Sequence, residues 1–303
     1  MKGLLYIWDS RKVLTILITM IALSVSTKSM ASTPSEVYQS TNNLVFHIEQ
    51  IRLNKNITSV AKKPGVQIAK TPIHAYTKAL EVFEKVIRFK EAHNWSHSKI
   101  PSLPEKNVTP EDVLDLIQVI IKELEDVNNK LGISVKKNSP LPEGKTPSDV
   151  YENLWRASYL FDGLVGAIEP TYVYRNTVRI EKALQKIAKK LNKSTAIIEP
   201  TIIQKQKPID ANISGYKVLY KLAVLEKKLG LIAVRVSGFP AGKITPSDVY
   251  DTTNNIIAEL TRINVHLNLP SVPDVDLSTE KITPSNVVFQ FKKIELLLNN
   301  ISS

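Results

Sequence analysis

The sequence contains no cysteine, and this absence excludes several kinds of structure and chemistry. The chain can form no disulfide framework, no thiolate-ligated zinc or iron–sulfur site, and no cysteine nucleophile. A lipid anchor attached to an N-terminal cysteine is excluded for the same reason. Glycine is also scarce, at 10 of 303 residues, and the sequence has no phosphate-binding loop, dinucleotide fingerprint or serine-hydrolase motif. We therefore predict no catalytic residues and no cofactor, and we expect the protein not to be an enzyme.

Histidine is scarcer still, at 5 residues, and offers one pair at a metal-ligand spacing. His93 and His97 are four residues apart, so they would share one face of a helix. No glutamate follows His93, and the pair lies beside a proline-rich stretch. We predict no metal site.

Long apolar runs are confined to the first thirty residues. A basic start with Lys2, Arg11 and Lys12 precedes a 13-residue apolar run, Val13 to Val25, and a small-x-small pattern ends at Ala31. This order predicts a secretory signal peptide over residues 1–31, cleaved after Ala31. The run is shorter than the roughly 20 residues that span a bilayer, which disfavours an uncleaved anchor. We expect a secreted or periplasmic protein.

The expected mature chain is moderately basic. The whole sequence has 40 Lys and Arg and 29 Asp and Glu, and residues 1–31 hold four of the former and one of the latter, which leaves 36 against 28, or +8. The basic residues are scattered along the chain, and nucleic acid is not an expected partner of an exported protein. We expect a protein partner in the cell envelope, with an anionic polymer or lipid surface as a second class of partner.

Prolines mark an internal repeat of about 38 residues. The intervals between them are 38, 38, 37, 23, 38, 38 and 38 residues. Apolar residues follow each proline at offsets near 3, 7, 10, 14, 17 and 21, which is the stripe of a helix that packs in a bundle. The repeat prolines are Pro34, Pro72, Pro110, Pro147, Pro170, Pro208, Pro246 and Pro284. We predict an all-α fold of eight amphipathic helices of about 20 residues, in one bundle or in two four-helix halves, residues 32–168 and 169–303.

A recurring phrase, Thr-Pro-Ser-Asp-Val-Tyr, explains how these helices begin. The threonine is suited to cap the helix, and proline is tolerated at the first helical position. An acidic residue three positions after threonine, such as Asp149 or Asp248, can close a capping box. The valine is the first core residue, and the tyrosine lies at the core edge with its hydroxyl available to the adjoining loop. We interpret the phrase as a helix start rather than a binding motif.

The connectors are long for a helical bundle. Most have about 15 residues with further prolines, enough to extend roughly 45 Å and return along a helix about 30 Å long. Neighbouring helices could therefore be parallel. Between the fourth and fifth helices the connector shrinks to a few residues around Gly166 and Glu169, where we predict a tight antiparallel hairpin.

Aromatic and charged residues gather around this short connector. The candidate ligand-binding residues are Trp155, Arg156, Tyr159, Asp162, Tyr172, Tyr174 and Arg175. Such a set can line a pocket, or it can form a buried polar junction between the halves. We expect the junction, in which Arg156 is buried with a carboxylate or hydroxyl partner across the hairpin and Asp162 has a basic partner such as Arg175.

Two functions remain open at this point. The first is an exported, non-enzymatic interaction or scaffold protein of the cell envelope. The second is a soluble small-ligand or lipid-binding protein with a pocket near the central hairpin. A pocket lined by Trp155, Arg156 and Tyr159 would favour the ligand function, whereas a filled junction with an exposed apolar patch would favour a protein partner.

Overall fold

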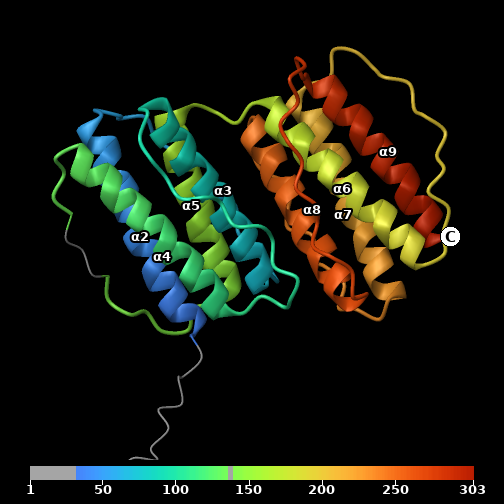
Figure 1. Cartoon of the computed structure of the whole chain (residues 1–303), viewed down its shortest axis with the longest axis horizontal. Helices are drawn as coiled ribbons and strands as arrows, with labels where there is room; N and C mark the ends of the chain where they lie inside the picture. The colour runs from blue at the N-terminus through green and yellow to red at the C-terminus, as the bar shows by residue number, and fades with distance from the viewer. Residues whose placement is uncertain (1–31, 136–138) are drawn as a thin grey trace, which may run out of the picture. The chain divides into compact units, whose positions relative to one another are not determined.

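The structure is a computed structural model that describes residues 32–135 and 139–303. The predicted signal peptide, residues 1–31, lies outside the described residues. The described part contains eight helices and no strand, which confirms the all-α prediction and the repeat (Figure 1). The helices are α2 (Pro34–Asn54), α3 (Pro72–Ala92), α4 (Pro110–Lys130), α5 (Pro147–Val165), α6 (Pro170–Lys190), α7 (Pro208–Lys228), α8 (Pro246–His266) and α9 (Pro284–Ser302). None of these helices is long and apolar enough to cross a membrane.

Every helix begins at a repeat proline, as the capping pattern predicts. At the start of α5, the Asp149 amide donates to Thr146 Oγ1 at 3.3 Å, and the Thr146 amide donates to Asp149 Oδ2 at 2.8 Å. This reciprocal pair satisfies two amides that the helix leaves free. In α3 the carboxylate is replaced by His74, whose Nδ1 accepts from the Thr71 amide. The helix-start interpretation of the phrase is confirmed.

Six helices also end in the same way, 22 residues after their proline. At that position the backbone is left-handed, with φ between 52° and 76°. Asparagine and glycine adopt this conformation at low cost and stop a helix. In α4, the Gly132 and Ile133 amides then donate back to the carbonyls of Asn129 and Asn128. The residues are Asn56, Asn94, Gly132, Asn192, Gly230 and Asn268.

The helices form two bundles of four, α2–α5 and α6–α9. In each bundle the four repeat prolines meet at one end around a small apolar hollow, above Val37, Ala75, Val113 and Val150 in the first bundle and their counterparts in the second. All four helices of a bundle therefore run in the same direction. The long connectors return along the bundles from the end of one helix to the start of the next (Figure 1).

The two bundles have the same internal order. In the first, α2 and α3 each pack against α4 and α5; in the second, α6 and α7 each pack against α8 and α9. Consecutive helices such as α2 and α3 are thus diagonal rather than adjacent. Because the first three prolines of each bundle are 136 residues apart and the fourth 137, the second bundle is an internal duplicate of the first.

The prediction that the fourth and fifth helices pair as an antiparallel hairpin is wrong. Gly166, at φ 80°, ends α5, and α6 begins four residues later, but the two helices do not pack against each other. The turn instead carries the chain from one bundle to the other, and the second bundle runs in the opposite direction (Figure 1). The bundles meet through α3 and α8.

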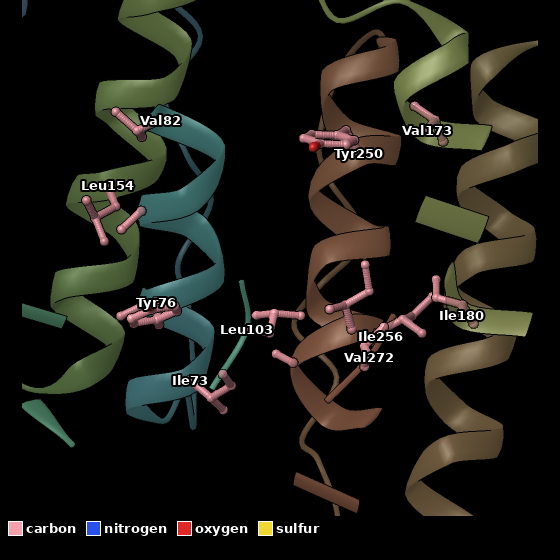
Figure 2. Close-up of a cluster of buried hydrophobic side chains, with 14 of the residues drawn as sticks. Ile73, Tyr76, Val82, Leu103, Leu154, Val173, Ile180, Tyr250, Ile256 and Val272 are labelled. Carbon is pink, nitrogen blue, oxygen red and sulfur yellow. The ribbon is translucent and has the colours of Figure 1, made fainter. Parts of the chain in front are cut away.

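Connector residues complete the core. Leu103, in the connector after α3, and Val272, in the connector after α8, are as buried as the helical core residues. Figure 2 shows Leu103 between α3, which carries Ile73 and Tyr76, and α8, which carries Tyr250 and Ile256. Extended segments therefore pack between and along the helices, as their apolar residues indicate.

We predict that replacing Thr146 with alanine lowers the free energy of unfolding by about 0.5–2 kcal/mol, because the Asp149 amide loses its acceptor. Urea unfolding measures the loss. The matched variant Thr146→Ser keeps the hydroxyl and should unfold close to the native midpoint; an equal loss in both variants would show that the methyl group, not the cap, stabilises the helix start.

Candidate functional site

The candidate residues on α5 are divided between two surroundings. Trp155 and Tyr159 lie in the seam between the bundles, which we define as the facing surfaces of α3, α5, α6 and α8. The rings of Trp155 and Tyr159 stack with centroids 5.6 Å apart, and Tyr151 meets Trp155 edge-on at 6.2 Å. All three rings are buried. This part of the seam is filled by aromatic packing.

The tyrosine hydroxyls bind carboxylates of the opposite bundle. Tyr151 donates to Asp251 Oδ1 at 2.5 Å and Tyr159 donates to Asp248 Oδ1 at 2.6 Å, both on α8. Burial and the nearby Asp248 raise the pKa of Tyr159 far above its ordinary value, so its hydroxyl remains a donor. The expectation that the repeat tyrosines serve their adjoining loops is wrong for Tyr151 and for Tyr250, because the seam offers carboxylate acceptors.

Two fully buried lysines of α3 link the helices of the seam. Lys78 binds Glu81 Oε2 at 2.7 Å and also contacts Asp251. Lys85 binds Asp162 Oδ1 at 2.5 Å and Ser158 Oγ at 2.7 Å, both on α5. Burial by itself lowers the pKa of Lys78, but the carboxylates of Asp251 and Glu81 outweigh it and raise the pKa above its ordinary value. The seam is therefore a paired ionic network.

Asp162 and Arg175 both lie in the seam, but they do not bind each other. Asp162 accepts from Lys85 and from Ser247 Oγ at 3.0 Å, so the predicted Arg175 partner is wrong. Arg175, on α6, binds Glu84 of α3 with Nη1 to Oε1 at 2.8 Å and donates to the Tyr250 hydroxyl at 2.9 Å. Geometry explains the difference: the turn places α6 away from α5, so each group pairs with a third helix.

Tyr172 and Tyr174, which precede Arg175, have smaller roles. The guanidinium groups of Arg88 and Arg175 lie over the Tyr172 ring, 5.0 and 5.4 Å from its centroid. Tyr174 is half-buried and packs against the core. These contacts hold the start of α6 against the first bundle.

Arg156 lies outside the seam, contrary to prediction. Its side chain is 51% exposed and binds Glu49 Oε1 of α2 at 2.6 Å. It borders an open groove that also includes Lys62, Lys63 and Asp149. Arg156 therefore lies on the flank of α5 that faces α2 and solvent, and the predicted partner across the hairpin is wrong.

A cavity of about 200 Å³ lies within the seam. Its polar walls include the Glu84–Arg175 pair and Arg179, which donates from Nη2 to Asp274 at 3.0 Å. Leu103 and Ile257 form part of its apolar wall. Among the seven candidate residues, Arg175 is the one that lines this cavity, and its charge is already paired.

A second buried cluster holds two carboxyl groups close together. Glu226 of α7 and Glu259 of α8 share Arg262, while Glu259 Oε1 also lies 2.7 Å from Nε2 of His74 on α3. Burial and the adjacent Glu259 raise the pKa of Glu226 to about 8. Burial opposes ionisation of Glu259, but His74, Glu226 and Arg262 lower its pKa to about 2. Sequence reasoning did not find this cluster, whose members are distant in the chain.

The face of α7 that points away from its bundle is apolar. Its core side carries Ala211, Val218, Leu222 and Leu225, while the opposite side carries a second row at spacings of 4, 3, 4 and 4 residues. Four members of this row are 43–60% exposed and Tyr216 is half-buried. The row, called the α7 stripe below, is Ile209, Ile213, Tyr216, Tyr220 and Val224.

The surroundings of the α7 stripe are apolar and basic. Nine of the sixteen exposed large apolar side chains in the described residues lie between residues 198 and 239, so exposed apolar surface is concentrated there. Phe239 of the next connector packs against Tyr216 with centroids 4.9 Å apart. Lys217, Lys221 and Lys228 flank the stripe. Residues 169–303 carry 19 Lys and Arg against 12 Asp and Glu, or +7, whereas residues 32–168 carry 17 against 16, or +1.

The internal duplication shows what the α7 stripe corresponds to in the first bundle. With the 136-residue offset, it falls on the face of α3 that packs against the second bundle at the seam. None of the corresponding α3 residues is exposed. They are Ile73, Thr77, Leu80, Glu84 and Arg88. The same face is thus covered by α8 in one bundle and open in the other.

Comparison of the chain with protein-family models, with curated proteins and with solved structures gives no match.

We predict that Lys78→Met, which removes the charge but keeps most of the volume, lowers the free energy of unfolding by about 3–5 kcal/mol, because buried carboxylates lose their cation. Arg156→Ala, on the exposed pair, should cost only about 0–1 kcal/mol. Chemical unfolding compares them. Adding Asp251→Asn should recover part of the Lys78→Met loss, and similar costs for the two single variants would contradict a buried ionic seam.

We also predict a pH dependence from Glu226. Because its pKa is raised in the folded protein, its contribution to stability is fully present below the unfolded value near 4.5 and is lost as pH rises through about 8. The free energy of unfolding of the native chain, relative to Glu226→Gln, should fall by roughly 1–3 kcal/mol between about pH 5 and 9. Glu49→Gln, at an exposed carboxylate, is the control and should show no such trend.

Proposed function

We propose that the protein is a non-enzymatic interaction or scaffold protein that binds an acid-flanked amphipathic helix of a protein partner along the α7 stripe. An exported, cell-envelope location is part of the proposal and rests on the pattern of residues 1–31. The observation that carries the proposal is the exposed apolar row on α7, on the opposite side of the helix from its core face.

The spacing of the stripe favours a helix as the occupant. Steps of four and three residues are those by which one helix receives the side chains of another. From Ile209 to Val224 the row extends about 22 Å, at 1.5 Å per residue, which matches several turns of a partner helix. The corresponding face of α3 already binds a helix, α8, so this face of the repeat is suited to that role.

The charges around the stripe favour an acidic partner. Lys217, Lys221, Lys227 and Lys228 are the basic residues of α7. Its two acidic residues are occupied, since Asp210 accepts from the Lys207 amide and Glu226 is buried beside Glu259 and Arg262. Two α7 stripes facing each other would oppose lysine to lysine, so a symmetric pairing of this surface is disfavoured. Acidic residues flanking an apolar row would complement it.

The filled seam supports the same proposal. The stacked rings and ion pairs around Trp155, Tyr159 and Lys85 hold the two bundles as one platform rather than leaving an open cleft at these residues. A rigid platform presents the stripe without the entropic cost of ordering it on binding.

We predict that a synthetic helical peptide with leucine at the a and d positions and glutamate at e and g binds the native protein, measured by fluorescence anisotropy. A matched peptide with lysine in place of glutamate should bind at least tenfold more weakly. Ile213→Ser combined with Tyr220→Ser should weaken binding of the acidic peptide at least tenfold, because the apolar row is lost.

The control variant is Leu53→Ser, at a side chain that is 67% exposed on α2, and it should bind like the native protein. Equal binding of both peptides, or an equal effect of the control, would contradict the proposal. Binding to vesicles of anionic lipid that depends on the α7 stripe, without peptide binding, would replace the protein partner with a membrane surface.

A further inference from the structure

The first bundle has an acidic helix, α4, whose exposed acids are Glu111, Asp115 and Glu125. It contains Glu111, Asp112, Asp115, Glu123, Glu125 and Asp126 against Lys122 and Lys130, so it carries four more acidic than basic residues. Its outward side also exposes Val119 and half-exposes Leu114. By the 136-residue offset, α4 is the counterpart of α8, the helix that covers α3 at the seam.

We infer that α4 of a second copy of this chain packs on the α7 stripe in the way that α8 packs on α3. This inference rests on the proposed function and names its partner. The outward face of α4 and the α7 stripe are on different bundles, so the contact between two copies is head-to-tail. Repeating such a contact produces an open chain of molecules unless the rotation closes a ring.

The exposed face of α7 keeps a polar contact that corresponds to one on the face of α3 covered by α8. In the seam, Lys85 Nζ binds Asp162 Oδ1 at 2.5 Å. At the corresponding place in the second bundle, Lys221 Nζ binds Asn299 Oδ1 at 2.6 Å. The α7–α9 surface is therefore built like the α3–α5 surface that receives α8, down to a lysine bridging the two helices.

The outward face of α4 also corresponds to the face of α8 that packs on α3. In the second bundle, Asn176 of α6 donates to Asn254 Oδ1 of α8 at 2.8 Å. In the first bundle, Gln118 of α4, the counterpart of Asn254, donates to Ser40 Oγ of α2, the counterpart of Asn176, at 3.2 Å. The outward side of α4 is thus held in the same register as that of α8.

The substitutions between the two contacts are mutually consistent. The seam pairs Glu84 with Tyr250 at 2.5 Å and Glu81 with Asn254 at 2.8 Å. Their counterparts pair Tyr220 with Leu114, an apolar contact, and Lys217 with Gln118, next to Asp115. Lys221 would face Glu111, the counterpart of Ser247. The α7 and α4 faces thus both differ from the seam, with an apolar row and opposite charges at its edges in place of buried ions.

One seam pair has no counterpart in the inferred contact. His74 binds Glu259 across the seam, and the corresponding residues are Asp210 and Glu123. Each of these acids is already held within its own bundle, Asp210 by the Lys207 amide and Glu123 by Lys90. The inferred contact therefore rests on the segment around Tyr220 and Leu114 rather than on the start of α7.

Sedimentation velocity of the expected mature chain, residues 32–303, tests the inference with paired charge reversals. The native protein should form larger species as its concentration rises and dissociate in high salt, since the edge pairs are exposed. Lys217→Glu with Lys221→Glu should be monomeric, as should Glu111→Lys with Asp115→Lys. An equimolar mixture of the two variants should regain association, because each reversed face then meets its complement.

The matched control reverses two exposed lysines of α6, Lys182→Glu with Lys189→Glu, and should associate like the native chain. Tyr220→Ser, which leaves all charges in place, should weaken association at least tenfold. It tests the same contact without relying on the correct folding of the charge-reversed chains. A native chain that stays monomeric at millimolar concentration, or a mixture that fails to associate, overturns the inference. If the acidic peptide still binds the α7 stripe in that case, the proposed function stands with another partner.

Discussion

The structure depends on one constraint: all four helices of each bundle begin at the same end. A chain that must start every helix at one end has to return the whole length of the helix between repeats, which explains the long, proline-containing connectors and why Leu103 and Val272 are buried with the helical core. Parallel order also gathers four positive helix ends. Carboxylates in the first turn, such as Glu36, Asp112 and Asp149, complement that charge, and the opposite direction of the second bundle balances it.

The seam follows from the same arrangement. Because the helices of a bundle are parallel, no hairpin of two paired helices joins one bundle to the other. The chain crosses between bundles in four residues, and the bundles are held together by α3 and α8. Burying Lys78 and Lys85 costs desolvation energy that pairing with carboxylates only offsets, so the network is a weak source of stability. We propose that the network specifies register instead, because sliding α8 by one turn would separate Tyr151 from Asp251 and Tyr159 from Asp248 together.

Local features of the fold were predictable and the partners in the seam were not. Thr146, its proline and Asp149 define a helix start within four residues. The left-handed position at Asn56 or Gly132 defines the helix end just as locally. The burial of Trp155 and Tyr159 was foreseeable, but Lys85 and Asp251 are 77 and 100 residues away from the groups they bind on α5. A shared flank for Arg156 and Asp162 cannot be inferred from steps of three residues, because two such steps turn a helix by about 120°, and the two side chains face different helices. Two sequence signals do indicate these surfaces. One is the run of small polar residues from Thr252 to Asn255 beside an apolar stripe, and the other is the second apolar row of α7.

The proposed partner contact on α7 would account for the different chemistry of the two copies of the face, which is ionic on α3 and apolar on α7. On α3 the partner helix belongs to the same chain, so its effective concentration is high and the contact can bear the desolvation of Lys78 and Glu81. On α7 the face is exposed whenever no partner is present. An ion network like that of the seam would be solvated there and would add no stability. Tyr220 and Val224, edged by solvated lysines, lose little when exposed and gain apolar burial when covered. The difference between Glu84 and Arg88 in one bundle and Tyr220 and Val224 in the other therefore agrees with our proposal of a permanent contact on α3 and a reversible one on α7.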